Sequence, residues 1–147
     1  MKFGMRLRFT DVLCDGTLKN VYYSGRKTGF SFDIRLGYYR GHYLSDIDEI
    51  SVKVDGEEFS QDDITFSLDG REYGMAELGE LYSVFWNLTT PATISIHRMG
   101  GLSAGEHRVE LEMWMRVPYL PLPGGDNDHT YMPLDNCDSK TMTLIEA

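Results

Sequence analysis

The sequence contains only two cysteines, Cys14 and Cys137, which lie far apart and form no CxxC spacing. Neither a disulfide-rich scaffold nor a cysteine-based zinc site is therefore expected. Long apolar runs are also missing, whereas a membrane-spanning helix needs roughly 18 consecutive apolar residues. The first eight residues carry positive charge but lack the apolar core of a secretory signal. These absences predict a cytoplasmic protein that has no membrane segment.

Basic residues are the minority, because 14 Lys and Arg stand against 23 Asp and Glu, for a formal net charge of −9. A polyphosphate would meet a repulsive overall field, so no nucleic-acid partner is expected. The charge is uneven: residues 1–45 carry 8 basic and 3 acidic side chains, whereas residues 46–80 carry 2 basic and 12 acidic ones. This polarity fits opposed solvated faces of a single domain. A protein partner steered by charge is the functional alternative.

Helical patterns are scarce, and the alternation of apolar and polar residues dominates. It is clearest in three segments, residues 30–36, 93–97 and 108–117. Each predicts a strand with one buried and one solvated face, as in antiparallel sheets. The last segment is the longest, and we expect Pro118 to end it because proline cannot donate to a ladder. At most one helical turn is expected, near Met75–Leu78.

The middle of the chain contains an internal repeat. Residues Ile50–Phe59 align without a gap on Ile64–Tyr73, and both alternate before they run into an Asp-Gly dipeptide. Asp-Gly is favoured in tight hairpins because both turn residues take positive φ. The repeat predicts two successive hairpins joined by the short acidic connection 60–63.

Short alternating strands separated by Gly and Asp turns indicate an all-β fold. We predict an antiparallel β-sandwich of jelly-roll or immunoglobulin-like type over residues 1–119. The stretch Pro118–His129 is punctuated by Pro and Gly. Residues 120–147 are therefore predicted to form an extended, Pro/Gly-rich C-terminal arm that packs on the sandwich or on a partner.

Motifs that would carry catalysis are missing: there is no nucleophile elbow, phosphate loop, dinucleotide fingerprint or HExxH. We place His97 and His107 on the solvated faces of their strands, as surface imidazoles. His129 follows Asp126 and Asp128, but this cluster lacks the rest of a calcium loop. No metal site is therefore assigned to the chain.

One stretch stands out, residues 35–45, with the sequence Arg-Leu-Gly-Tyr-Tyr-Arg-Gly-His-Tyr-Leu-Ser. Tyrosine and arginine are typical of interface hot spots, because rings bury area at low entropy cost and guanidinium groups give directional hydrogen bonds. The same side chains would suit a sugar or a polyphenol, whose faces stack and whose hydroxyls need donors. A loop that packs its tyrosines on its own sandwich is the plainer alternative.

This stretch belongs to a series of matching segments that resembles a known family. In chain order the segments are Leu18–Val21, Gly29–Leu36, Tyr38–Gly41, Leu44–Ser45, Val52–Gly56, Ile64–Phe66, Tyr73 and Gly100–His107. Together they resemble the small (β) subunit of bacterial C-glycoside deglycosidases, over roughly residues 16–119. Tyr-Tyr-Arg-Gly is the most specific element, whereas the Gly-Gly-Leu turn recurs in many sandwiches.

The resemblance implies a subunit of a two-component enzyme. Its partner would be a barrel-type α subunit that resembles sugar-phosphate isomerases and holds a divalent metal, manganese, together with a general base. The pair would cleave the carbon–carbon bond of a 3-keto C-glycoside with a flavonoid-type aglycone. The keto group acidifies the C2 hydrogen, a tuned base removes it, the metal stabilises the enolate, and the aglycone leaves by β-elimination.

The chain itself has no convergent His, Asp and Glu set, so no catalytic residue, cofactor or metal is assigned to it. Its implied role is to stabilise and complete the active site of the α subunit. The surface expected to face partner or substrate comprises Arg35, Tyr38, Tyr39, Arg40, His42, Tyr119 and His129. A free-standing carbohydrate-binding sandwich is the alternative, with Trp114 on a solvated strand face as a stacking platform. A structural domain without a ligand is the third.

Overall fold

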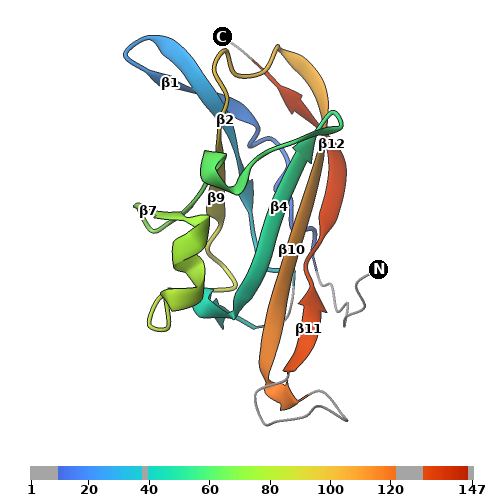
Figure 1. The fold of residues 1–147 in the computed structure, drawn as a ribbon. Coiled ribbons are helices and arrows are strands. Elements are labelled where there is room, and N and C mark those ends of the chain that lie inside the picture. The colour runs from blue at the N-terminus through green and yellow to red at the C-terminus, as the bar shows by residue number, and fades with distance from the viewer. Residues whose placement is uncertain (1–9, 38–39, 122–130, 146–147) are drawn as a thin grey trace.

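Alternating apolar residues build two antiparallel sheets that face each other, as Figure 1 shows. The computed structural model describes residues 10–37, 40–121 and 131–145. The first sheet has the order β1-β2-β9-β6-β7, made of Lys19–Tyr23, Arg26–Ile34, Ala92–His97, Ile64–Leu68 and Arg71–Gly74. The second has the order β11-β10-β4-β5 with β12 also on β10, made of Tyr131–Asp135, Gly105–Pro121, Ile47–Val54, Glu57–Glu58 and Asp138–Leu144. The prediction of an antiparallel β-sandwich is confirmed.

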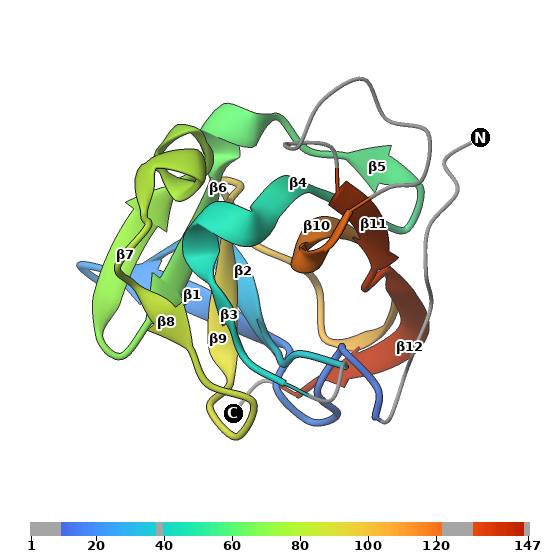
Figure 2. The same ribbon diagram turned by 90° about the horizontal axis from the view of Figure 1, so that it is seen from below.

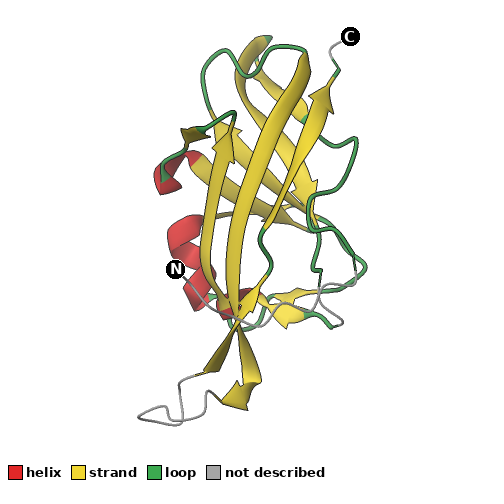
Figure 3. Ribbon diagram, turned by 90° about the vertical axis from the view of Figure 1, so that its right-hand side faces the viewer, coloured by secondary structure: helices red, strands yellow, loops and turns green. Residues whose placement is uncertain are grey.

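Helix is confined, in the described part of the chain, to short 3-10 turns (Figure 3). They are η1 (Leu44–Asp46), η2 (Gln61–Asp63) and η3 (Met75–Glu80). The last confirms the helical turn expected near Met75, but the expectation of at most one turn is wrong, because η1 and η2 are two more. None of these turns has the length or the apolar character that crossing a bilayer requires.

The core lies between the two sheets and is made by the predicted alternating strands. Phe30, Phe32 and Ile34 of β2 are completely buried. From the opposite sheet, β10 contributes the buried side chains Val109, Leu111, Met113, Met115 and Val117. Each large apolar side chain removed from water in this way contributes about 1.5–3 kcal/mol.

The internal repeat forms two hairpins, as predicted, with both turn residues of each in the left-handed region. The φ angles are 51° at Asp55 and 85° at Gly56, and 52° at Asp69 and 82° at Gly70. The first hairpin, β4–β5, lies in the second sheet, whereas the second hairpin, β6–β7, lies in the first sheet. The short acidic connection, which forms η2, therefore carries the chain from one sheet to the other.

The expectation that Pro118 ends the long strand is wrong, because β10 continues to Pro121. The partner register with β11 jumps between Arg116 and Pro121, and pairing with β4 stops at Met115. Pro118 thus sits in a gap of the ladder, where its missing N–H breaks no paired position.

The C-terminal part of the chain extends the second sheet. Residues 131–144 of the predicted arm form β11 and β12, which pair with successive halves of β10. Residues 122–130, which include most of the Pro/Gly-rich stretch, lie outside the described residues. The strands beyond residue 119 are therefore part of the sandwich itself.

Two side chains placed on solvated faces are in fact buried. His107 is 7% exposed, because it has the same strand parity as Val109 and so points to the core side of β10. Trp114 does lie on the outer face, yet it is only 8% exposed in a central strand, with Glu49 and Asp135 as its cross-strand neighbours. It offers no open ring face, which removes the platform of the carbohydrate-binding alternative.

His107 is tied to the first hairpin turn. Its Nδ1 lies 2.6 Å from Asp55 Oδ2, and its Nε2 lies 2.7 Å from the Ser103 carbonyl oxygen. Burial and the Arg98 charge oppose protonation, but the hydrogen bonds and the Asp55 charge together raise the pKa of His107 above 6.5. The hydrogen bonds from His107 and from the Arg108 N–H lower the pKa of Asp55 below 3.8.

This pair predicts a window of pH in which it stabilises the fold. The His107 contribution is complete below pH 6.5 and is lost as pH rises through the folded pKa, whereas the Asp55 contribution is lost as pH falls below 3.8. We expect Asp55→Asn to reduce the loss of melting temperature between about pH 6 and pH 8. Asp69→Asn, in the equivalent turn, is the matched control and should keep the wild-type profile. Identical profiles for both variants in thermal denaturation would contradict this role.

Candidate functional site

The stretch 35–45 leads into a two-stranded ribbon, β3 (His42–Tyr43) paired with β8 (Phe85–Trp86). Two further backbone bonds extend the pairing, from Leu44 N to Val84 O (2.9 Å) and from Ser45 N to Leu81 O (3.2 Å). The ribbon lies at the end of the sandwich that faces the viewer in Figure 2. Because successive side chains of a strand point to opposite faces, one residue of each two-residue strand faces inward and the other faces outward.

The outward side of the ribbon exposes aromatic rings. Tyr43 and Phe85 are each 47% exposed, and their ring centroids lie 5.1 Å apart in an edge-to-face arrangement. Tyr82, just before β8, is 73% exposed. Arg40, two residues before β3, is exposed as well, and tyrosine and arginine side chains are enriched in interface hot spots. We call Arg40, Tyr43, Tyr82 and Phe85 the ribbon surface.

Gly41 allows this aromatic pair to sit close to the backbone. A methyl group at Gly41 would lie within 2.7 Å of both the Phe85 ring and the Trp86 carbonyl oxygen. A side chain at this position would therefore displace Phe85 or open the ribbon. This gives a physical reason for the glycine that follows Arg40.

The inward side of the ribbon anchors it. His42 is only 3% exposed, and its Nδ1 lies 3.2 Å from Asp46 Oδ2. Trp86 is completely buried, donates from Nε1 to the Thr90 carbonyl oxygen (2.7 Å) and packs edge-to-face on Phe66. His42 therefore does not lie on the surface predicted for it, because alternation pairs it with Trp86 on the buried side.

The other predicted surface residues are placed as follows. Arg35 is exposed, and its Nε donates to the Asp11 carbonyl oxygen (3.0 Å); Arg40 is exposed on the ribbon surface. Tyr119 lies in β10, but its side chain is not among those that the structure describes. Tyr38, Tyr39 and His129 lie outside the described residues.

The exposed rings of Tyr43, Tyr82 and Phe85 were not among the surface residues predicted from the sequence. The sequence did contain a signal for Tyr43, because side chains alternate along a strand and an inward His42 leaves Tyr43 facing outward. The partner rings come from a segment some forty residues later, and no local pattern announces that β8 pairs with β3.

A hollow of about 430 Å³ lies beside Arg35. It is lined by Cys14, Thr17, Asp33, Arg35, Leu88, Thr89 and Pro91. The Asp33 carboxylate accepts a hydrogen bond from Thr93 Oγ1 (2.7 Å). The Thr17 hydroxyl donates to the Cys14 carbonyl oxygen and accepts from the Asp33 N–H. Burial raises the pKa of the Cys14 thiol, with the Arg35 charge opposing the shift. The thiol is therefore protonated near neutral pH and suited to packing rather than to attack.

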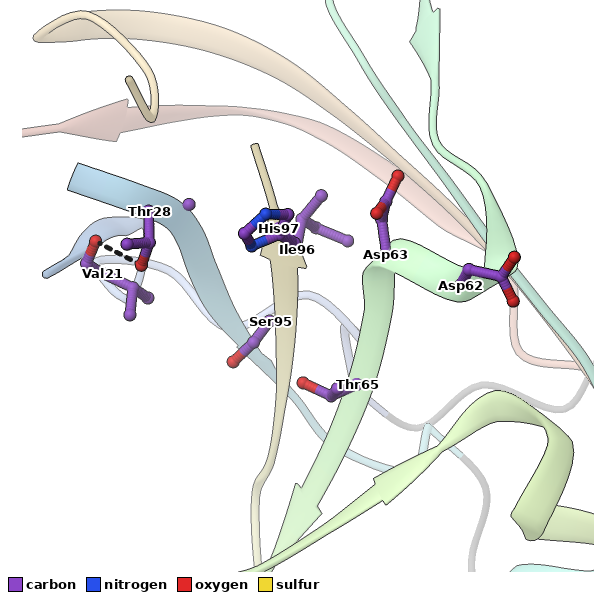
Figure 4. Close-up of a pocket in the computed structure, with 9 residues that line it drawn as sticks. Val21, Thr28, Asp62, Asp63, Thr65, Ser95, Ile96 and His97 are labelled. Carbon is purple, nitrogen blue, oxygen red and sulfur yellow. Dashed lines mark hydrogen bonds between the residues drawn. The ribbon is translucent and has the colours of Figure 1, made fainter. Parts of the chain in front are cut away.

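A smaller hollow, about 200 Å³, lies on the outer face of the first sheet. Figure 4 shows Thr28 and Asp63 on either side of His97, with Ser95 and Thr65 nearby. His97 is exposed, as predicted. Among residues 10–37, 40–121 and 131–145, no three His, Cys, Asp or Glu side chains are grouped so that they could hold a metal ion.

The chain is similar in sequence to a known protein family and to several named proteins. Residues 9–119 match the family model described as C-glycoside deglycosidase beta subunit, a span that contains the whole ribbon. A C-glycoside deglycosidase beta subunit from Eubacterium cellulosolvens is 35% identical over 98 residues, which cover 67% of each chain. A 3'-dehydrocarminate deglycosidase beta subunit from a Microbacterium species is 37% identical over 100 residues, covering 67% of this chain and 74% of the relative.

A third relative, a C-glycoside deglycosidase beta subunit from Arthrobacter globiformis, is 27% identical over 95 residues, which cover 64% of this chain and 72% of the relative. The matches are consistent with one another in the role that they name. This chain belongs to the C-glycoside deglycosidase beta subunit family.

Proposed function

We propose that this chain is the small, non-catalytic β subunit of a two-component C-glycoside deglycosidase. The match of residues 9–119 to the family carries the proposal, and the relatives are themselves named as beta subunits, which implies a companion chain. The companion proposed here is a barrel-type α subunit that holds a divalent metal, manganese. This chain stabilises the α subunit and completes its active site.

The substrate class proposed is a 3-keto C-glycoside with a flavonoid-type aglycone. One relative is named for a 3'-dehydro compound, which is the oxidation state that this chemistry needs. A carbonyl at C3 acidifies the C2 hydrogen, so a general base can remove it and the aglycone can leave by β-elimination. A divalent metal on the companion would stabilise the enolate oxygen as a Lewis acid.

The part of this chain proposed to face the companion or the substrate is the ribbon surface together with Arg35. Its rings can stack on an aromatic aglycone or pack on a protein surface. Arg35 and Arg40 supply donors for hydroxyl or carboxylate groups. The buried side of the ribbon, held by His42 and Trp86, keeps these groups in place before the companion binds.

The test is co-expression with a metal-dependent barrel protein of the proposed α-subunit type. The two chains should co-purify, and the complex should release the aglycone from a 3-keto C-glycoside, whereas this chain alone should release none. Turnover by the homogeneous chain alone would contradict the proposal. Failure of the pair to associate would contradict it as well.

Arg40 gives a prediction specific to the proposed surface. We expect Arg40→Ala to weaken association or turnover about 10-fold, or about 1.4 kcal/mol, as truncation of an arginine at an interface hot spot does. The side chain is exposed, so the melting temperature should stay within a few degrees of wild type. Lys53→Ala, on β4 of the second sheet, is the exposed cationic control. Equal affinity and turnover for Arg40→Ala and wild type would remove Arg40 from the surface.

A further inference from the structure

The β1–β2 hairpin projects beyond the rest of the first sheet, at the upper left of Figure 1. Its tip pairs Tyr23 with Arg26 across the turn residues Ser24 and Gly25. Both turn residues are left-handed, with φ of 50° and 76°, as the tightest hairpins require. Tyr22 is 55% exposed and Tyr23 is 75% exposed.

The hairpin is held rigidly at its base. The Asn20 side chain makes two hydrogen bonds with Leu102, donating to its carbonyl oxygen (2.9 Å) and accepting from its N–H (2.8 Å). Gly100 N donates to Lys27 O (3.1 Å), which brings the 98–102 loop alongside. The neighbouring Met99 is 64% exposed. A tip that is already ordered loses little conformational entropy when it binds.

The charge of the hairpin is opposite to that of the protein. Residues 16–32 contain Lys19, Arg26 and Lys27 and no acidic residue, in a chain of net charge −9. Tyrosine, serine, glycine and arginine on a rigid loop are also the composition that antibodies use for protein contacts. The tip therefore combines large rings with a local positive charge, which favours an acidic protein surface that has room for a ring.

We propose that the β1–β2 hairpin is a preformed docking element that inserts Tyr23 into an acidic surface of the companion subunit. This inference rests on the proposed function for the existence of that companion. It assigns the hairpin to assembly, whereas the ribbon surface keeps the role proposed above, which is to face the companion or the substrate. Lys19 and Arg26, both exposed, steer the encounter, and Tyr23 supplies the buried contact.

The experiment measures the affinity of the two full-length chains and their association and dissociation rate constants by surface plasmon resonance, together with turnover of the complex at saturation. Tyr23→Ala should weaken binding at least about 10-fold through faster dissociation. Arg26→Glu should weaken it about 10-fold through slower association, and raising salt from about 0.05 M to about 0.5 M should shrink that deficit. Turnover at saturation should equal wild type for both. Ile145→Ser, a change at an 83% exposed apolar residue, is the matched control and should bind as wild type does.

The outcomes separate the two proposals. If wild-type chains do not associate, the proposed function fails. If they associate and the hairpin variants bind equally well, the hairpin assignment alone is overturned. Loss of turnover at saturation would also overturn it, because it would place Tyr23 at the reacting site. Self-association of the purified chain that Tyr23→Ala abolishes would show that the hairpin docks on a second copy instead.

Discussion

We expect Leu111→Asp to abolish the cooperative unfolding transition of this chain and to leave it unfolded at 25 °C. Leu111 is 2% exposed in β10, the strand that joins β4 on one side to β12 on the other, with Val52 and Asp138 as its partners. A carboxylate there faces the apolar interior between the sheets. Burial of an unpaired charge costs several kcal/mol, against a total stability of about 5–15 kcal/mol for a domain.

Two control variants isolate the charge as the cause. Glu110→Asp keeps a carboxylate one position away on the solvated face of β10 and should be nearly neutral. Leu111→Met keeps the apolar volume and should cost less than about 1.5 kcal/mol. Circular dichroism during heating measures all three variants. A Leu111→Asp protein with the wild-type melting temperature would show that the assigned strand register is wrong.

The sandwich itself could be predicted because its signals are local. Alternation in β2 and β10 depends on a side-chain period of two, and the Asp-Gly turns depend on backbone sterics at adjacent residues. Both kinds of signal can be seen within ten residues. The error at Pro118 came from missing information about where neighbouring strands pair along β10 and where they stop. The error at His107 did not, because its parity with Val109 already indicates the core side of the strand.

The candidate surfaces could be predicted only in part, because they are made by segments far apart in the chain. The stretch 35–45 was identified by composition, but its outward rings are completed by Tyr82 and Phe85 through a strand pairing with no sequence signature. The β1–β2 hairpin was signalled only by the turn residue Gly25. Local sequence does not indicate that the tip is exposed, because exposure depends on what packs against the hairpin. In a strand whose face is covered by another sheet, Tyr23 would be a core residue.

Gly29→Ala is the second change with a large expected effect, and its cause is steric rather than electrostatic. A methyl group at Gly29 would overlap the Ile96 carbonyl oxygen and lie 3.0 Å from its carbon. Those atoms belong to the backbone of β9, which is paired on both sides by β2 and β6, so they cannot turn away as a side chain would. Gly29 also faces the irregularity in β1, between Val21 and Tyr22.

Relief of this overlap requires β2 to move from β9 in the middle of the first sheet, so we expect Gly29→Ala to destabilise the fold by about 3 kcal/mol. Gly79→Ala is the matched control, since nothing lies within 4 Å of its added methyl group and its 3-10 turn tolerates alanine. Denaturant unfolding measures both free energies. Equal stability of the two variants would contradict the close approach. Gly29 lies in β2 at the base of the β1–β2 hairpin, so a shift of β2 would also move the hairpin. If the proposed docking role is right, a Gly29→Ala chain that still folds should therefore bind the companion more weakly.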